Sequence, residues 1–289
     1  MRAIVRGVNE GRNGLGNIYV WASGDGGQDD DCNCDGYAAS MWTISINSAI
    51  NNGENAHYDE SCSSTLASTF SNGAKDPHTG VRNSLYDSKN RFHWNMNGVG
   101  LEFNHLFGYG VLDAGAMVAL AKIWKTVPPR YHCEAGTHNK IMRIPSNESL
   151  LVGITTKACK NTETEVNYIE HVQAVITLNA TRRGDVTLFL ISPMGTRSMI
   201  LSRRPKDDDS RDGFTKWPFM TTHTWGEDPK GRWQLEVKFE GEQPQSGFLI
   251  EWTLMIHGTK EPPYKDLPVH DRNSKLAVVK KAHESAFKN

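Results

Sequence analysis

Residues 18–37 read IYVWASGDGGQDDDCNCDGY, and they join an apolar run, a glycine-rich loop and a cluster of carboxylates. The run from Ile18 to Ser23 has the length and the flanking glycines of a buried strand. It leads into residues 24–27, where three glycines indicate a tight loop. The carboxyl end of a parallel strand is where α/β proteins build their sites, so a site could lie here, although the glycines alone indicate only a turn.

Four carboxylates stand within seven residues just after these glycines. They are Asp29, Asp30, Asp31 and Asp35. The plainer interpretation is a solvated acidic loop. The sharper one is a Ca²⁺ site, a pocket that accepts a cation, or both, because calcium prefers carboxylate oxygens. The residues alone leave both interpretations open.

The rest of the first part of the chain contains fewer regular patterns. Ala38–Ile50 and Ser63–Phe70 read as a second and a third strand, whereas residues 74–97 are polar and have no clear period. Apolar residues recur at helical spacing from Ala114 to Trp124, and the two prolines at 128–129 end that helix. We therefore place a domain boundary after residue 127.

From residue 131 to about residue 258 the pattern changes to short alternating strands separated by turn residues. The clearest strands are Val172–Leu178, Asp185–Leu190, Gly231–Val237 and Leu249–Leu254. Without a long helix between them, they predict an all-β sandwich or barrel over residues 128–260. Residues 261–289 form a polar tail. Its segment Lys275–Lys288 can be read as a short amphipathic helix or, in the interpretation we favour, as a frayed terminus.

Charge and hydrophobicity exclude several classes of protein. The 32 Lys and Arg residues nearly balance the 33 Asp and Glu residues, so bulk charge would not hold the chain to nucleic acid. No run approaches 18 consecutive apolar residues, and no transmembrane helix is expected. A hydrophobic content of 38% is too high for a disordered chain.

The indications of cellular compartment are divided. Residues 1–9 lack the apolar region of a signal peptide, so the literal expectation is a chain that is not secreted. Two glycosylation sequons, at Asn147 and Asn179, matter only in a secretory route. The five cysteines favour two disulfides and one buried thiol over a zinc site, because the C-x-C spacing at residues 32–34 is unlike that of zinc ligands.

Motifs in both halves point to one family. In the first half they are Gly24–Gly27, Cys32–Tyr37, Cys62–Ala67 and Phe107–Met117, and in the second half Arg182–Asp185, Ser192–Thr196 and Phe219–Trp225. In this order they resemble the subtilisin/kexin proprotein convertases, from about residue 7 to residue 264. The resemblance implies a partial subtilisin-like α/β domain, with a parallel sheet and helices, followed by an all-β, jelly-roll-like barrel called the P domain or homo B.

The resemblance also implies roles for residues of the acidic loop. Asp25 takes the oxyanion-hole position, where most of the family has asparagine, and aspartate there marks one subgroup. A protonated acid can donate a hydrogen bond to an oxyanion and an ionised one cannot, so a buried Asp25 would favour acidic conditions. Asp35 is expected to line the pocket for the basic P1 side chain, and Tyr37 to lie near the P4 position. The expected substrate-binding set is completed by Trp21, Ala22, Ser23 and Gly24.

Calcium and disulfides follow from the same resemblance. Asp30 and Glu60 match two ligands of a calcium ion beneath the P1 pocket, with a third ligand expected upstream of this chain, so Ca²⁺ is the expected cofactor. The implied disulfides are Cys32–Cys62 and Cys133–Cys159, which leave Cys34 as a free thiol. Arg183-Gly184-Asp185 looks like an integrin motif, but in this family it is a structural turn.

The catalytic triad is the main departure from the family pattern. Subtilisin-type catalysis uses Asp, His and Ser in that order, and the Asp and His motifs are expected upstream of Met1. The Gly-Thr-Ser-Ala nucleophile motif is missing after residues 71–73, which indicates an internal gap near residues 81–82. Ser84 and His78 do not lie in a motif that could replace it. We therefore expect this chain to be catalytically incompetent by itself.

Two functions follow from these observations. The first is a calcium-dependent serine endopeptidase of the S8 class that processes prohormones and neuropeptide precursors at paired basic residues. Its expected location is the regulated secretory pathway, in dense-core granules or outside the cell, and its expected partners are precursor substrates, its own propeptide and a neuroendocrine chaperone. The second is a non-catalytic binding module, a P domain with a protease remnant, that competes for partners.

Overall fold

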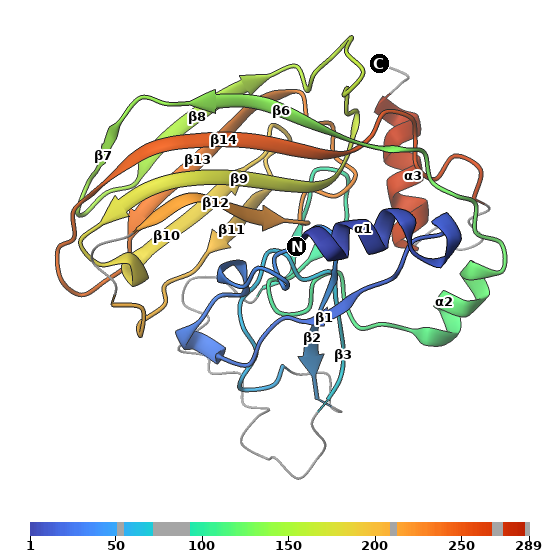
Figure 1. Ribbon diagram of the computed structural model, residues 1–289, viewed down its shortest axis with the longest axis horizontal. Coiled ribbons are helices and arrows are strands. Elements are labelled where there is room, and N and C mark those ends of the chain that lie inside the picture. The colour runs from blue at the N-terminus through green and yellow to red at the C-terminus, as the bar shows by residue number, and fades with distance from the viewer. Residues whose placement is uncertain (51–54, 72–92, 209–212, 268–273, 287–289) are drawn as a thin grey trace.

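The computed structural model describes residues 1–50, 55–71, 93–208, 213–267 and 274–286. Figure 1 shows two parts side by side, a small first part with a parallel sheet and a larger body of long antiparallel strands. No helix in these ranges is long and apolar enough to cross a membrane. The gap expected near residues 81–82, together with Ser84 and His78, lies outside the described residues.

Short elements make up the first part, residues 1–127. They are α1 (Arg2–Glu10), η1 (Arg12–Gly14), β1 (Val20–Ala22), η2 (Gly27–Asp29), η3 (Cys32–Cys34), β2 (Ile44–Ala49), β3 (Ala67–Phe70), β4 (Asn95–Met96), β5 (Glu102–Phe103) and α2 (Ala114–Ala121). β1, β2 and β3 form a parallel sheet in that order, with Val20 opposite Ile44 and Ile46 opposite Ala67. Each strand expected in this part is present, in a shorter form.

The second strand starts later than its apolar pattern indicates. β2 begins at Ile44, whereas the pattern predicts a start at Ala38. Between these positions the Trp42 N–H donates to Ser40 Oγ, and the Thr43 hydroxyl donates to two backbone carbonyls. Such side-chain-to-backbone bonds offer the chain a turn in place of a strand, and here they override the alternation.

The second body is a sandwich of two antiparallel sheets, called the sandwich below. Its elements are β6 (Arg130–His138), β7 (Met142–Ile144), β8 (Leu150–Thr156), β9 (Tyr168–Ala180), η5 (Arg183–Asp185), β10 (Val186–Ile191), β11 (Arg197–Leu201), β12 (Phe214–Thr221), β13 (Gly231–Phe239) and β14 (Gly247–Thr259). One sheet has the order β11-β10-β13-β8, and the other β12-β9-β14-β6 with β7 beside β14. The described strands thus form an all-β body of two sheets, as the sequence pattern predicts for a sandwich or barrel, and the jelly-roll description stays a prediction.

Side chains from both sheets fill one core. Along β9 the buried positions alternate with partly exposed ones, as expected for a strand with one covered face. Trp233 on β13 and Trp252 on β14 are completely buried at its centre, and the Trp233 indole N–H donates to Pro229 O over 2.9 Å. Burial of a large aromatic side chain contributes roughly 1.5–3 kcal/mol, so these tryptophans anchor the two sheets to each other.

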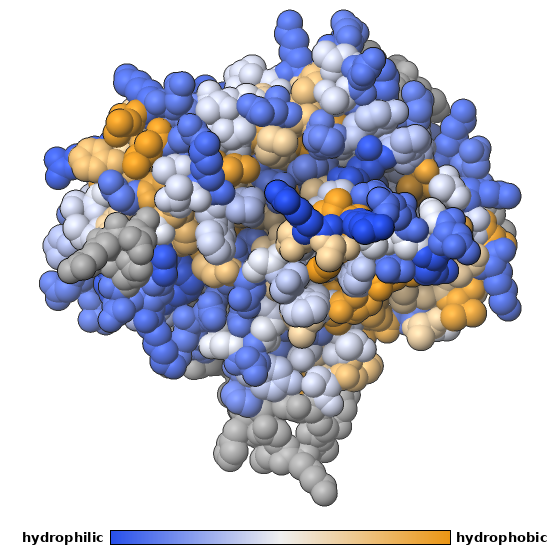
Figure 2. Space-filling model, in the orientation of Figure 1, coloured by the Kyte–Doolittle hydropathy of each residue, from blue (hydrophilic) through white to orange (hydrophobic). Residues whose placement is uncertain are grey.

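Helix α2 is apolar yet uncovered. Its N-terminus is capped by Asp113, whose carboxylate accepts the Ala116 N–H, and it ends at Ala121, three residues before the expected end at Trp124. None of its residues is buried, although its sequence is AGAMVALA. Figure 2 shows apolar side chains at the surface below α1 and around α2. An apolar helix normally packs against a neighbour, so this surface is suited to being covered by another protein.

The tail contains a helix where a frayed terminus was the favoured expectation. α3 spans Lys275–Ala286. Ser274 precedes it and accepts the Ala277 N–H at its hydroxyl, as a helix cap does. Val279 is buried, and its methyl groups lie over Gly226 of the sandwich. Burial of this one apolar side chain stabilises the helix more than the polar composition of the tail suggests.

Both expected disulfides, Cys32–Cys62 and Cys133–Cys159, are present, with Cα atoms 5.6 and 5.9 Å apart. Cys34 is the free cysteine of the described residues. The Arg183-Gly184-Asp185 sequence forms the turn η5, as expected. Asp185 is buried there and accepts hydrogen bonds from Arg182 and Arg203, so it is not available as an integrin ligand.

Two neutral histidines are buried near the β9–β14 ladder. His257 donates or accepts a 2.9 Å hydrogen bond with Gln173, and His171 packs edge-on against Trp225. Burial lowers the pKa of His171 to about 4, and the charge of Arg130 lowers it further. Burial also lowers the pKa of His257 to about 3, helped by neighbouring positive groups, first His171 and then Arg130. An unfolded histidine titrates near 6.5, so the unfolded chain binds more protons below that pH. The contribution of these histidines to the free energy of unfolding is therefore fully present above about pH 6.5 and is lost as the pH falls.

We expect the substitution His257→Gln to weaken the acid sensitivity of the fold. Between pH 7.5 and pH 5.0 each such histidine removes about 2 kcal/mol from the free energy of unfolding, because protonation favours the unfolded chain. Glutamine does not titrate, so the variant should lose about 2 kcal/mol less over this interval. Urea unfolding at the two pH values measures the difference, with the exposed His93→Gln as control. An identical loss in His257→Gln and wild type would contradict this account.

Candidate functional site

The acidic loop, residues 24–37, follows the carboxyl end of β1, as the sequence predicts. Two aromatic residues flank it: the rings of Trp21 and Tyr37 lie 4.8 Å apart and both are largely exposed. Ala22 is exposed beside them, whereas Ser23 is buried and donates to Asn47 Oδ1 over 2.8 Å. The structure therefore gathers the expected substrate-binding residues around the exposed end of one strand.

Glycines allow the loop to fold closely over Glu60. Gly24 has a φ of +133°, a conformation that favours glycine, and a side chain there would collide with the Glu60 carboxylate. The Gly26 N–H donates to Glu60 Oε1 over 2.9 Å, and Asp30 also lies against Gly26. The two expected calcium ligands, Asp30 and Glu60, are thus neighbours although 30 positions separate them in the sequence.

Negative charge accumulates at this place. Burial, partly opposed by the Gly26 N–H and supported by the charges of nearby aspartates, raises the pKa of Glu60 to about 8. Burial and the charge of Asp30 also raise the pKa of the exposed Asp35. Like charges that raise one another's pKa values favour a bound cation, which removes the repulsion.

The residues fit a calcium ion only in part. Glu60 Oε2 is buried and has no hydrogen-bond partner, so it offers a free oxygen next to Asp30. Calcium takes 6–8 oxygen ligands. The described residues, however, contain no group of three or more His, Cys, Asp or Glu side chains that could hold a metal. Two carboxylates would therefore need backbone, water or further protein oxygens to complete a site.

Asp25 differs from its expected environment. The oxyanion-hole argument places this carboxyl in a buried position, and in the structure Asp25 is exposed at the bend after β1. The described residues do not enclose it. The oxyanion-hole role of Asp25, which concerns the complete enzyme, stays a prediction.

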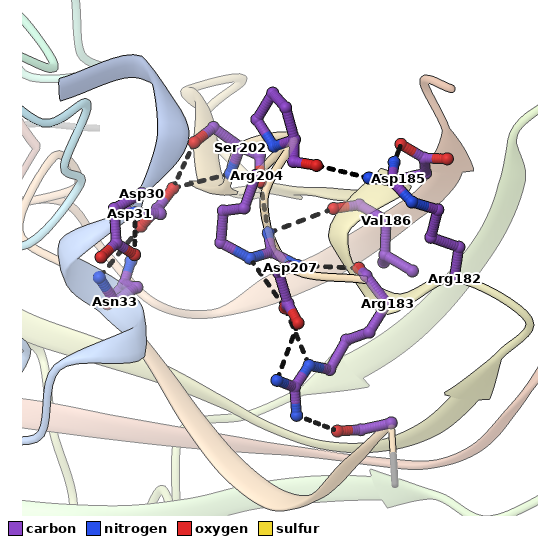
Figure 3. A network of polar contacts seen from close by, with 12 residues as sticks. Asp30, Asp31, Asn33, Arg182, Arg183, Asp185, Val186, Ser202, Arg204 and Asp207 are labelled. Carbon is purple, nitrogen blue, oxygen red and sulfur yellow. Dashed lines mark hydrogen bonds and ion pairs between the residues drawn. The ribbon is translucent and has the colours of Figure 1, made fainter. Parts of the chain in front are cut away.

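Two residues of the loop lie where the sequence patterns do not predict: Asp31, which belongs to the acidic run, and Asn33, which lies between two cysteines. Both are buried and both bind the sandwich. Asp31 Oδ2 accepts hydrogen bonds from the backbone and the hydroxyl of Ser202 (Figure 3). The Asn33 amide donates to the Ile200 carbonyl over 2.8 Å. A polar residue between two cysteines was the only signal in the sequence, and it does not identify a partner.

A cavity of about 560 Å³ lies on the sandwich side of the acidic loop. Asp30, Cys34, Arg183, Asp207 and Trp217 are among its lining residues, whereas Asp35 and Tyr37 are not. Its charged side chains bind one another: Arg183 forms two hydrogen bonds with Asp207, at 2.8 and 2.9 Å. Burial raises the pKa of the Cys34 thiol to about 12, so this thiol is not a reactive nucleophile.

One serine–histidine pair is present in the described residues, but it cannot act on a substrate. Ser198 Oγ lies 2.8 Å from His223 Nδ1. Both residues are completely buried at the junction of the two parts, and His223 stacks on Phe103. Burial lowers the pKa of His223 well below its usual value. The pair is therefore a structural contact of the interior.

The two sequons lie at the surface of the sandwich. Asn147 is exposed in the turn between β7 and β8. Asn179 is exposed on β9, where its Oδ1 accepts the Phe248 N–H over 2.9 Å. Both positions are accessible, and their glycosylation stays a prediction.

Comparison with known proteins relates the chain to one family. Residues 169–256 match the family described as proprotein convertase P-domain. Neuroendocrine convertase 2 of Drosophila melanogaster is 63% identical over 335 aligned positions, which cover 98% of this chain and 51% of that protein. Neuroendocrine convertase 2 of Homo sapiens is 55% identical over 333 positions, covering 97% and 52%.

The chain spans about half the length of these curated relatives. Its 289 residues are fewer than the 335 aligned positions, so dozens of positions in the aligned region have no residue here. Among solved structures, the serine protease of Aeromonas sobria superposes with a TM-score of 0.69 at 15% identity, over 89% of this chain and 67% of that chain. At this identity the likeness concerns the fold alone.

We expect Gly24→Ala to destabilise the loop, because the side chain would require a strained φ and would displace Glu60. A loss of about 1–3 kcal/mol in the free energy of unfolding is expected. Gly36→Ala is the matched control, since open space surrounds its Cβ position. Thermal or urea unfolding of both variants provides the measurement. Equal stabilities of the two variants would show that the close approach at Gly24 does not matter.

Proposed function

This chain belongs to the proprotein convertases, as a homologue over about half the length of the neuroendocrine convertase 2 proteins, and we propose that it is the substrate-binding and P-domain portion of a serine endopeptidase of that type. The substrates of such an enzyme would be prohormones and neuropeptide precursors with paired basic residues. The observation that carries the proposal is the clustering of Asp30, Asp35 and Glu60 at the exposed end of β1.

A basic peptide would meet complementary groups at this place. Asp35 is exposed and would bind a guanidinium or ammonium group by charge-assisted hydrogen bonds. The exposed rings of Trp21 and Tyr37 would support a further basic or apolar side chain. Among the described residues β1 pairs with β2 alone, so an extended peptide would add as a further strand along the other edge of β1.

Asp30 and Glu60 would hold calcium in this proposal, with other oxygens completing the shell. The ion would supply positive charge where these carboxylates otherwise repel each other. Glu60 Oε2 without a partner supports this role. The protein's own contribution is to keep both carboxylates at one place through the Gly26 hydrogen bond and the Cys32–Cys62 disulfide.

This chain by itself would bind a peptide without cleaving it. The nucleophile motif is absent from its sequence, and the buried Ser198–His223 pair cannot replace a triad. An enzyme that loses its triad keeps only the weak rate enhancement that substrate binding and the oxyanion hole provide. The activity of the longer relatives would then depend on segments that this chain does not contain.

The remaining roles are proposals by homology. The site of action would be the secretory pathway, with dense-core granules as the place of processing. A propeptide and a neuroendocrine chaperone would be further partners, and Asn147 and Asn179 would carry glycans.

A second candidate function is a non-catalytic module that competes for partners. The uncovered apolar helix α2 favours it, with Met117 and Val118 more than half exposed. Such a surface is common at protein–protein contacts. In that case the chain would act by occupying a partner and not by recognising a peptide.

We expect calcium to stabilise the chain through Asp30 and Glu60. At a calcium concentration a hundredfold above Kd, the free energy of unfolding should rise by about 2.7 kcal/mol. Glu60→Gln should abolish the rise, whereas the exposed sandwich variant Glu148→Gln should keep it. Thermal unfolding with and without calcium measures both. A rise that persists in Glu60→Gln would place the ion elsewhere.

We expect the chain to bind a fluorescein-labelled peptide containing Lys-Arg and to leave it intact. Asp35→Asn should weaken binding about tenfold or more, because a hydrogen bond to a charged group contributes roughly 1.5–3 kcal/mol. Fluorescence anisotropy in the presence of calcium measures affinity, and mass spectrometry of the peptide detects cleavage. Glu148→Gln and an Ala-Ala peptide are the controls. Equal affinity for the two peptides would overturn the proposed recognition, and specific turnover would overturn the inactivity.

A further inference from the structure

The acidic loop has exposed carboxylates at both ends and buried side chains between them. Asp30 and Asp35 are exposed at its two ends and form the proposed site. Between them Asp31 and Asn33 are buried against the sandwich, and Cys32 is bonded to Cys62 of the first part. The buried residues thus lie between Asp30, which would bind calcium, and Asp35, which would bind the basic side chain.

Asn33 binds the edges of both sheets of the sandwich. Its Nδ2 lies 2.8 Å from the Ile200 carbonyl on β11 and 3.0 Å from the Met220 carbonyl on β12, and its Oδ1 accepts the Met220 N–H over 3.0 Å. β11 and β12 are the terminal strands of the two different sheets. The indole N–H of Trp217 also donates to the Asn33 carbonyl over 2.8 Å. One side chain therefore binds backbone groups at the edges of two strands, and the Met220 carbonyl also accepts the Ser63 hydroxyl over 2.6 Å.

Asp31 adds a second attachment on the same side of the loop. Its Oδ2 lies 2.7 Å from both the nitrogen and the hydroxyl oxygen of Ser202, which follows β11 directly. Its Oδ1 accepts the Asn33 N–H over 2.9 Å. Figure 3 shows Asp31 between Asn33 and Ser202. The two attachments share a hydrogen bond, so they hold the loop as one unit.

We propose that Asp31 and Asn33 are positioning residues, through which the sandwich sets the spacing of Asp30 and Asp35 and so determines the specificity for basic side chains. This rests on the proposed function of the loop as a peptide site. Neither residue touches the peptide; they act through the two exposed carboxylates. Buried polar side chains hold their partners tightly because any other arrangement leaves groups unpaired, which makes them suited to fix a geometry.

A matched control exists at the same junction. Asn97 is also buried, and it also bridges the first part to the sandwich, since its Nδ2 donates to the His223 and Trp225 carbonyls over 3.1 and 3.0 Å. It lies in the turn between β4 and β5, outside the acidic loop. Asn33→Ala and Asn97→Ala therefore remove the same chemistry at the same kind of interface.

The experiment measures affinity for the Lys-Arg peptide in the presence of calcium, together with thermal unfolding, for both variants of the full chain. Asn33→Ala should weaken binding about tenfold, and Asn97→Ala should change it less than twofold at a similar loss of stability. A merely structural role predicts equal effects of the two variants on affinity. That result would overturn the proposal.

A double variant in the sandwich guards against misfolding of Asn33→Ala. Ser202→Ala with Trp217→Phe removes two donors to the loop and leaves the loop sequence intact. It should weaken peptide binding about tenfold and speed hydrogen exchange of residues 29–37, whereas Asn97→Ala should not speed it. Unchanged exchange and affinity in the double variant would overturn the proposal. If the wild-type chain binds no peptide while the double variant still shows faster hydrogen exchange of residues 29–37, the attachment of the loop would stand and the proposed function would be overturned.

Discussion

The hydrogen bonds of Asn33 and Asp31 to the sandwich hold the first part of the chain in place. The sandwich has a continuous core from both sheets, with Trp233 and Trp252 at its centre. The described residues of the first part form two small buried clusters, one around the Cys32–Cys62 disulfide and one around Ala49 and two neighbouring side chains. Such clusters bury too little apolar surface to stabilise a domain, so the first part depends on its attachment to a larger body.

The attachment also holds several carboxyl groups close together in the loop. Asp31 lies within hydrogen-bond reach of Ser202, and Glu60 is bound by the Gly26 N–H, yet burial raises the pKa of both carboxyls, to about 6 for Asp31 and about 8 for Glu60. Fixed donors can hold a carboxylate at a place where its neighbours repel it. The arrangement concentrates charge at the end of β1, where a cation or a basic side chain would relieve the repulsion.

The tail helix also packs against the junction between the first part and the sandwich. α3 places Val279 over Gly226 of the sandwich and Val278 over Gly100, a residue of the turn that Asn97 anchors. Both glycines have a φ near +85°, and each leaves room for a valine methyl group. The junction thus contains a polar attachment at the acidic loop and an apolar one under α3. Helix α2 and the strand edge of β1, by contrast, remain exposed and define the faces on which a partner or peptide could bind.

Sequence patterns predicted the strands of both parts because alternation of apolar residues reflects burial of one face, which is a local property. The family motifs further indicated the two disulfides and assigned roles to Asp30, Asp35 and Glu60. The patterns failed where local hydrogen bonds or distant contacts determine the structure. Residues 38–43 form turns where the pattern predicts a strand. The tail forms a helix because Val279 packs against Gly226. Most of all, the sequence presents its aspartates as one acidic run. Only the tertiary structure decides that Asp31 faces inward and Asp30 and Asp35 outward, because the strand edges that accept Asp31 and Asn33 lie some 170 residues further along the chain.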